Sequence, residues 1–217
     1  MDKCQIIEAI KKEKLISVIR YKDQEKIKKI VDSIVAGGIN LIEITMTVQN
    51  AIDIIKKLAI KYKDSNVIIG AGTVVESQIA QDAIDAGAMF IVSPVLNKDI
   101  IKICNEHNIL VVPGIATPTE AYEALKSGAD VLKLFPSNAF DPSIIKTYKG
   151  PFPNIKLMPT GGINLDNINE WIDNGAIAVG IGGELLKEFN GENFEDITNT
   201  VKLFKEKIVK ENQIYEN

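Results

Sequence analysis

Val131-Leu132-Lys133-Leu134-Phe135-Pro136 places a lysine at the centre of a run that is otherwise apolar. The run follows Ser127-Gly128-Ala129-Asp130, which is typical of a helix end and a tight turn, and it stops at a proline. These features predict a buried strand of a parallel sheet. Because side chains alternate along a strand, Lys133 shares a face with Val131 and Phe135, and we expect that face to look into the interior that the sheet encloses.

Lys133 itself has two interpretations. Its stem could pack against apolar neighbours while the ammonium reaches water near the strand end. Alternatively, the amine forms a Schiff base with a carbonyl substrate, because burial favours the neutral, nucleophilic form of a lysine. The strand alone does not distinguish the two, so the choice depends on the rest of the chain.

The composition predicts one globular domain that binds neither nucleic acid nor membrane. The chain has 217 residues, 46% of them hydrophobic, which is enough for a large core in a single domain over 1–217. Its net charge of −4 argues against nucleic acid as a main partner. The amphipathic, charged segment 1–15 does not resemble a signal peptide, and no uncharged apolar run reaches the roughly 18 residues of a membrane span.

The rarest reactive residues narrow the chemistry further. Cys4 and Cys104 are isolated in the sequence, and without an export signal they indicate free thiols in a reducing, cytoplasmic setting. His107 is the single histidine, which leaves little material for a histidine-rich metal site or a Ser-His-Asp triad.

The alternation of short apolar runs with amphipathic segments predicts a (β/α)₈ TIM barrel, preceded by an extra N-terminal helix at 2–14. A doubly wound open sheet would need fewer strands. The eight strands are expected at 15–20, 39–45, 67–73, 89–94, 109–113, 131–136, 155–159 and 177–180.

The carboxyl ends of these strands would converge on one mouth. By the same alternation Glu43 faces the interior with Lys133, whereas Ile42 and Ile44 point to the helices. An amine and a carboxylate in one cavity suit Schiff-base chemistry, which needs an acid/base to move protons. A structural ion pair remains the alternative.

Two glycine-rich segments follow the last two predicted strands, Pro159-Thr160-Gly161-Gly162 and Gly180-Ile181-Gly182-Gly183. Barrels often seat a phosphate there on backbone N–H groups, and glycine lets the backbone come close to the anion. Ligand-free turns are the alternative interpretation. Glu184 is discordant, because a carboxylate directed inward would repel a phosphate.

The chain resembles the 2-keto-3-deoxy-6-phosphogluconate (KDPG) aldolase family, which includes 4-hydroxy-2-oxoglutarate aldolases. The resemblance implies a homotrimeric TIM barrel and a class I aldolase of the Entner–Doudoroff pathway that needs no metal or cofactor and releases pyruvate from a 2-keto-4-hydroxy acid. The motifs that carry it are Leu41-Ile42-Glu43-Ile44-Thr45, Gly70-Ala71-Gly72-Thr73-Val74, Ser93-Pro94, Val112-Pro113-Gly114, Leu132-Lys133-Leu134-Phe135-Pro136 and Pro159-Thr160-Gly161-Gly162-Ile163.

The resemblance also implies roles for individual residues. Lys133 would form the Schiff base, and Glu43 would act as acid and base through a water molecule. The other residues would surround the substrate, with Thr73 at the pyruvyl carboxylate, Phe135 and Pro94 as walls, Thr160 beside the imine, and Gly161, Gly162, Gly182 and Gly183 at the phosphate.

Two positions depart from the pattern of some family members. Thr47 stands where they carry a carboxylate-binding arginine, and we expect Arg20 to reach the same mouth instead. Glu184 stands where some place a phosphate-binding serine. We expect cleavage of KDPG to pyruvate and glyceraldehyde 3-phosphate, and also of 4-hydroxy-2-oxoglutarate to pyruvate and glyoxylate. The alternatives are a phosphosugar isomerase or epimerase, or a ligand-binding barrel without activity.

Overall fold

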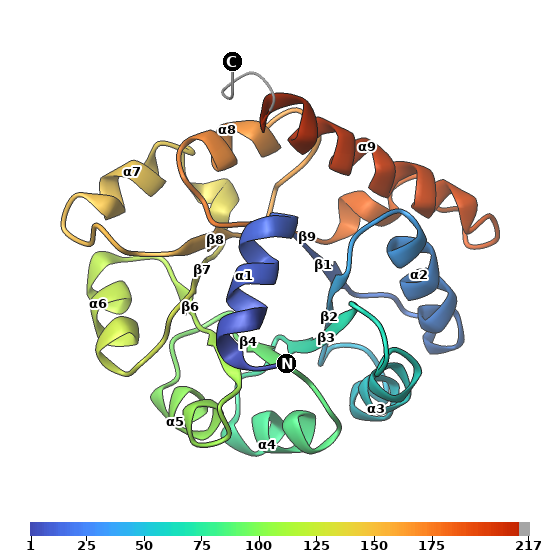
Figure 1. The fold of residues 1–217 in the computed structure, drawn as a ribbon, viewed down its shortest axis with the longest axis horizontal. Helices are drawn as coiled ribbons and strands as arrows, with labels where there is room; N and C mark the ends of the chain where they lie inside the picture. The colour runs from blue at the N-terminus through green and yellow to red at the C-terminus, as the bar shows by residue number, and fades with distance from the viewer. Residues whose placement is uncertain (213–217) are drawn as a thin grey trace.

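The computed structural model describes residues 1–212. In it, helices pack around a curled parallel sheet (Figure 1). The chain forms a single-domain α/β fold. The α-helices are α1 (Lys3–Glu13), α2 (Gln24–Ala36), α3 (Ala51–Lys61), α4 (Ser77–Asp85), α5 (Lys98–Glu106), α6 (Pro118–Lys126), α7 (Ile144–Lys149), α8 (Ile168–Asp173) and α9 (Glu195–Asn212), with 3₁₀ turns η1 (Ser137–Ala139) and η2 (Gly183–Leu186). No helix within these residues is long and apolar enough to cross a membrane.

The strands pair in parallel in two sheets. They are β1 (Leu15–Ile19), β2 (Leu41–Thr45), β3 (Ile68–Gly72), β4 (Phe90–Val92), β5 (Leu110–Val112), β6 (Gly114–Ile115), β7 (Leu132–Leu134), β8 (Leu157–Pro159) and β9 (Val179–Ile181). One sheet has the order β5-β4-β3-β2-β1-β9, and the other has the order β6-β7-β8.

Two seams join the sheets. β5 and β6 are consecutive in the chain and are separated only by Pro113, which has no N–H to donate to a ladder. On the other side, a parallel bridge between Thr160 and Gly180 connects the end of β8 to β9. The predicted strand at 109–113 therefore differs from the structure, because the chain continues as a second short strand after the proline.

The alternation predicted for β2 and β7 is confirmed. Ile42, Ile44, Leu132 and Leu134 belong to the large cluster that strands and outer helices share. Val131 belongs to a separate interior cluster, together with Leu41. Alternate side chains of each strand thus face the helices or the interior, as the strand pleat requires. The polar residues Glu43 and Lys133 lie on the enclosed side.

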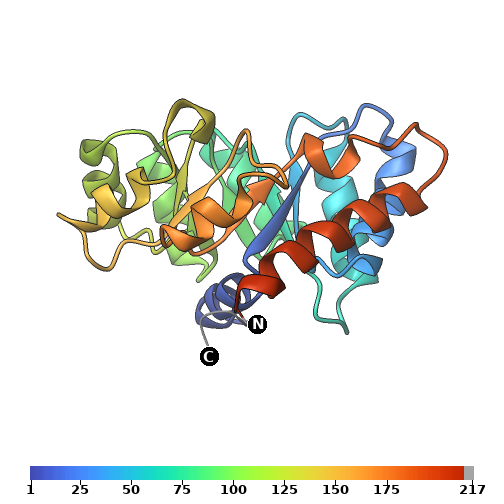
Figure 2. The same cartoon turned by 90° about the horizontal axis from the view of Figure 1, so that it is seen from above.

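Helix α1 closes one end of this interior. Its Ile6, Ile7 and Ile10 are buried in the same cluster as Leu41 and Val131. Figure 1 shows α1 lying across the middle of the ring of helices, and Figure 2 shows it at the end where β1 begins. A substrate can therefore approach Lys133 only from the opposite end, where the strands have their carboxyl ends.

Two helix starts differ from the sequence expectation. Asp141-Pro142 has the pattern of an N-cap followed by a proline at the first helical position, which predicts a helix from Pro142, but α7 begins at Ile144 with Ser143 as N-cap. The Asp141 carboxylate still accepts the Ser143 N–H, but in a turn before the helix. The apolar spacing after Asn164 also predicts a helix from Leu165, but α8 begins at Ile168, because the Asn164 side chain accepts the Asp166 N–H and holds the preceding residues in a turn.

Candidate active site

Lys133 lies in β7 with only 4% of its surface exposed. Its backbone is fixed on both sides, since Gly114 pairs with it in β6 and Met158 in β8. Its Nζ lies 5.0 Å from the centroid of the Phe135 ring, close enough for a cation–π contact. The amine is therefore held inside the sheet, beside a partly exposed aromatic ring.

Glu43 lies in β2 and is completely buried. Neither of its carboxylate oxygens has a hydrogen-bond partner among the described residues. Gly72 in the neighbouring strand leaves room for the side chain, because a Cβ there would overlap the Glu43 carboxylate. Burial raises the pKa of this carboxyl, against the opposing charges of Lys133 and Arg20. A carboxyl with a raised pKa can both take up and release a proton near neutral pH.

Thr160 brings a third polar group to the same interior. It is buried, and its Oγ1 has no hydrogen-bond partner within residues 1–212. Gly180 makes space for it, since a Cβ at Gly180 would overlap Thr160 Oγ1. The unpaired oxygens of Glu43 and Thr160 thus face an interior that offers them no internal partner, which is typical of a site that completes its hydrogen bonds with a ligand or water.

A cavity of about 440 Å³ opens beside Thr160. It brings together several residues that the sequence predicted for substrate binding with Glu184, and it adds Val18 and Asn164, which the sequence did not single out. Its lining consists of Val18, Arg20, Thr160, Gly161, Gly162, Ile163, Asn164, Gly180, Gly182, Gly183 and Glu184.

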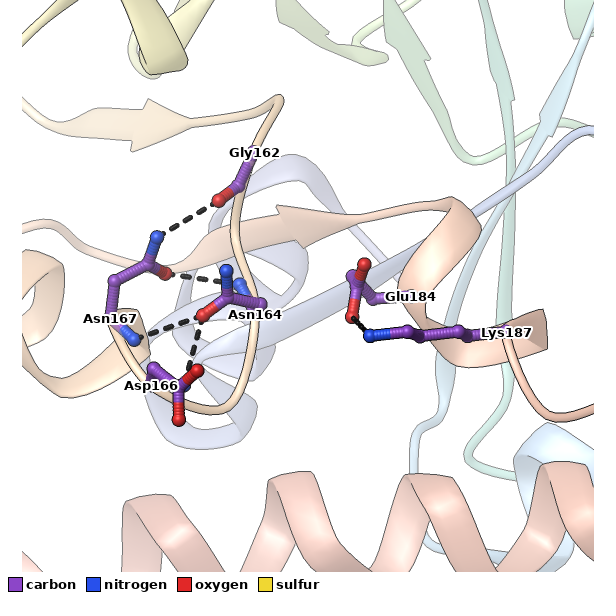
Figure 3. Close-up of polar contacts among 6 residues, drawn as sticks. All are labelled: Gly162, Asn164, Asp166, Asn167, Glu184 and Lys187. Atoms are coloured by element: carbon purple, nitrogen blue, oxygen red, sulfur yellow. Dashed lines mark hydrogen bonds and ion pairs between the residues drawn. The ribbon is translucent and has the colours of Figure 1, made fainter.

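The Glu184 side chain borders both the cavity and the solvent. It lines the cavity, but its carboxylate lies 3.7 Å from the ammonium of Lys187 and its side chain is 39% exposed. Figure 3 shows the Glu184 side chain, from η2, meeting that of Lys187, which directly follows η2, across from the Asn164 turn. The cation and the solvent both reduce the repulsion that this carboxylate would exert on an anion in the cavity.

The remaining predicted residues lie outside this cavity. Thr73, directly after β3, has a φ of 56°, which is rare for a β-branched residue and marks a constrained position. Pro94 is half-buried after β4, and a Cβ at Gly114 would overlap its carbonyl. Thr47 is exposed, and its hydroxyl pairs with that of Thr45 at 2.8 Å. Arg20 lines the cavity together with the glycine segments, whereas Thr47 does not.

Sequence reasoning missed the side chains that support the glycine segment after β8. Ser137, which is completely buried in η1, donates a hydrogen bond to the Gly161 carbonyl at 2.5 Å. Asn167 donates to the Gly162 carbonyl at 2.9 Å (Figure 3). The Asn164-x-x-Asn167 spacing before a helix could have indicated a turn, but nothing in the sequence pointed to Ser137.

Comparisons with known proteins identify the family to which the chain belongs. The profile of the family described as "Aldolase: KDPG and KHG aldolase" matches residues 6–200. The 2-dehydro-3-deoxy-phosphogluconate aldolase of Treponema pallidum is 33% identical over 168 residues, which cover 77% of this chain and 79% of that protein. The 2-dehydro-3-deoxy-6-phosphogalactonate aldolase of Escherichia coli is 32% identical over 174 residues, covering 80% and 84%.

A solved structure supports the chemistry as well as the fold. The KDPG aldolase of Legionella pneumophila, with pyruvate captured as a covalent carbinolamine intermediate, has a TM-score of 0.82 and 31% identity, covering 90% of this chain and 96% of that one. Fold, buried amine and relatives together define a carbon–carbon lyase of the Schiff-base class. The chain belongs to the KDPG and KHG aldolase family, and it is a class I aldolase.

Proposed function

We propose that this enzyme cleaves KDPG to pyruvate and glyceraldehyde 3-phosphate, and that Lys133 and Glu43 carry out the chemistry. The observation that carries the proposal is the placement of a 4%-exposed lysine and a completely buried glutamate on the enclosed side of the sheet. The opposing effect of Lys133 on the Glu43 carboxyl indicates that their charges interact. Burying both groups is costly, and their use in imine formation and proton transfer would account for that cost.

The reaction begins when the Lys133 amine attacks the C2 carbonyl of the substrate. Loss of water from the resulting carbinolamine gives a protonated imine. Glu43, acting through a water molecule, then removes the proton of the C4 hydroxyl. The C3–C4 bond breaks, its electrons pass to the imine nitrogen, and the aldehyde leaves.

The bound enamine must then become pyruvate. Glu43, now protonated, returns its proton to C3, again through water, and hydrolysis of the imine releases pyruvate and the free amine. The same carboxyl therefore acts as base and then as acid, which suits a group whose pKa is raised from its ordinary value. Thr160, with its unpaired Oγ1, would hydrogen-bond beside the imine.

The substrate's two charged ends need separate partners. We propose that Thr73, at its constrained position after β3, binds the pyruvyl carboxylate, and that Pro94 and Phe135 wall this end. The phosphate would lie in the cavity lined by Gly161, Gly162, Gly182 and Gly183, with Arg20 supplying positive charge. Thr47, which is exposed, would contact substrate only at the rim.

The names of these relatives leave the configuration at C4 of the substrate open, because the gluconate- and galactonate-derived substrates differ there and release the same aldehyde. The gluconate- and galactonate-derived substrates in those names both carry a phosphate, so the same cavity would serve either. Cleavage of the unphosphorylated 4-hydroxy-2-oxoglutarate is a second candidate activity. The observation that favours it is Glu184, a carboxylate in the cavity lining.

We also propose that the two sheets form one closed (β/α)₈ barrel domain over residues 1–217, with α1 as an additional helix. Support comes from the β5–β6 continuity through Pro113 and from the Thr160–Gly180 bridge. If β5 and β6 count as one strand, eight strands remain around the ring.

We propose a homotrimer in the cytoplasm as the working form. Three apolar side chains near the carboxyl ends of the strands, Val75, Val95 and Phe135, are at least 36% exposed, as a surface that packs against another copy would be. Cys4 and Cys104 are free thiols, which fits a reducing compartment.

Covalent trapping tests the proposed function. Incubation with pyruvate and borohydride should attach one reduced three-carbon adduct per chain, and peptide mapping should place it on Lys133. Lys133→Ala and Lys133→Arg should both abolish trapping and cleavage, because a guanidinium keeps the charge without the nucleophilicity.

Lys156 provides the matched control. It precedes β8, and its backbone carbonyl accepts the N–H of Leu132, so it is close in the fold but only partly buried. Lys156→Ala should trap pyruvate at the normal rate. An adduct on Lys156 or any other lysine would disprove the role given to Lys133.

A further inference from the structure

The glycine segment after β8 is fixed from outside the cavity by two side chains. The Ser137 hydroxyl donates to the Gly161 carbonyl at 2.5 Å, and the Ser137 N–H donates to the Thr160 carbonyl at 3.0 Å. The Asn167 amide donates to the Gly162 carbonyl at 2.9 Å. Neither Ser137 nor Asn167 lines the cavity, so any effect on a ligand passes through the backbone that they hold.

The direction of each carbonyl determines the direction of the next amide. In a planar trans peptide, the N–H of a residue points opposite to the C=O of the residue before it. The Gly161 carbonyl points to Ser137, and therefore the Gly162 N–H points away from Ser137. In the same way, the Ile163 N–H points away from Asn167.

We infer that Ser137 and Asn167 are positioning residues for anion recognition. By turning two carbonyl oxygens outward, they present the N–H groups of Gly162 and Ile163 to the phosphate in the cavity. If the two peptides turned over, carbonyl oxygens would face the anion and repel it. The inference rests on the proposed function, which puts the substrate's phosphate in this cavity.

Ser137 also relates the anion cavity to the reacting amine. It follows Lys133 by four residues and is completely buried. The turn that contains it packs closely on the segment, since a Cβ at Gly162 would lie 2.7 Å from Asn138 Cβ. The same turn thus sets the separation between Lys133 and the phosphate, which a substrate bound at both ends has to match.

Asn167 is supported by a reciprocal turn. Its Oδ1 accepts the N–H of Asn164 at 3.0 Å, and Asn164 Oδ1 accepts the N–H groups of Asp166 and Asn167 (Figure 3). The turn precedes α8 and holds the Asn167 amide at the Gly162 carbonyl. Two elements far apart in sequence, η1 and the turn before α8, therefore act on adjacent peptides.

The test compares Ser137→Ala and Asn167→Ala with matched controls elsewhere. Ser127→Ala removes a hydroxyl that donates to the Glu123 carbonyl at the end of α6. Asn174→Ala removes an amide that donates to the Glu170 carbonyl at the far end of α8. Each control loses the same kind of bond, but away from the cavity.

We expect KM for KDPG to rise about tenfold in Ser137→Ala and in Asn167→Ala, with kcat within twofold of the parent enzyme. Competitive inhibition by inorganic phosphate should weaken in parallel. In both variants, KM for 4-hydroxy-2-oxoglutarate and the rate of pyruvate trapping should not change. In the two control variants, KM for KDPG and inhibition by phosphate should equal those of the parent enzyme. Equal losses on both substrates, or no loss on KDPG, would overturn the inference.

Failure of the inference and failure of the proposed function give different results. If the parent enzyme traps pyruvate on Lys133 but phosphate neither inhibits nor distinguishes the variants, the positioning role is wrong and the aldolase chemistry stands. If no adduct forms, the proposed function is wrong as well. Thermal unfolding of each variant, measured in parallel, identifies any that lose KDPG affinity through loss of fold.

Discussion

At the level of single residues, Glu43 carries an electrostatic cost for its burial. It is completely buried, and desolvation outweighs the attraction of Lys133 and Arg20, so the pKa of its carboxyl is raised. Such a cost is retained where the group is needed to move protons. Glu43→Gln should therefore lower turnover by about 10²–10⁴-fold, as for loss of a positioned acid/base. Normal turnover and normal proton exchange at the pyruvate methyl would show that Glu43 is structural.

The same substitution should change how stability depends on pH. A carboxyl whose pKa is higher in the folded state binds its proton more tightly when folded, and its contribution to stability is lost as pH rises through that raised pKa. Glutamine cannot ionise. The melting temperature of Glu43→Gln, relative to that of the parent enzyme, should therefore increase as the pH rises above about 4. Parallel pH profiles for the two proteins would contradict this assignment.

We propose that phosphate preference depends on Glu184, which lines the cavity. Two like charges about 4–5 Å apart would repel by roughly 3–4 kcal/mol at an effective dielectric near 20, but Lys187 and solvent offset much of this for a carboxylate that is 39% exposed. We expect Glu184→Ser to change KM for KDPG only a few-fold, with Glu188→Ser as a nearby surface control. A hundredfold improvement, with 4-hydroxy-2-oxoglutarate unaffected, would instead identify an unphosphorylated natural substrate.

At the level of elements, α1 contributes stability and no chemistry. Its Ile10 is completely buried in the interior cluster. Ile10→Ala should lower the free energy of unfolding by about 2–5 kcal/mol, the range for large-to-small changes in a core. Ile60, which is mostly exposed on α3, provides the matched control, and Ile60→Ala should be close to neutral. Denaturant unfolding measures both, and a neutral Ile10→Ala would show that α1 is not part of the core.

The elements also show how far sequence reasoning reaches. Alternation along β2 and β7 is enough to place Glu43 and Lys133 on the enclosed side, because a one-residue slip would turn both charged groups into the apolar cluster that strands and helices share. Helix starts were less certain. Asp141 has the chemistry of an N-cap, yet it closes a turn two residues earlier, and this choice depends on how the whole segment packs.

Ser137 shows why part of the site could not be predicted. Its hydroxyl bond joins residues that are 24 positions apart, and a lone serine after a proline carries no local signal of such a partner. The Gly72 and Gly180 contacts are similar, because only the folded sheet reveals that each glycine makes space for a polar side chain on the next strand. The sequence period therefore predicts which side chains share a face of a strand, whereas contacts between distant residues that support the site are seen only in the folded structure.

For the whole molecule, the prediction concerns assembly. Val75 and Val95 are exposed apolar side chains that follow the adjacent strands β3 and β4, and exposed Phe135 follows β7. If copies pack through them, light scattering should give about three times the 23.8 kDa of one chain. Val95→Asp should reduce this mass, because a charge would be buried in the interface. Leu203→Asp, at an exposed position on α9, should leave the mass unchanged. A monomeric parent enzyme would refute the trimer.

The closure of one end by α1 has a consequence for the reaction run in reverse. The keto acid must reach Lys133 from the carboxyl ends of the strands, so it occupies the blind end of the site, while its aldehyde partner stays nearest to solvent. The end of the site that α1 closes excludes larger molecules by size, whereas the end that faces solvent does not. In carbon–carbon bond synthesis, this catalyst should therefore accept few nucleophiles other than pyruvate but a broad range of acceptor aldehydes.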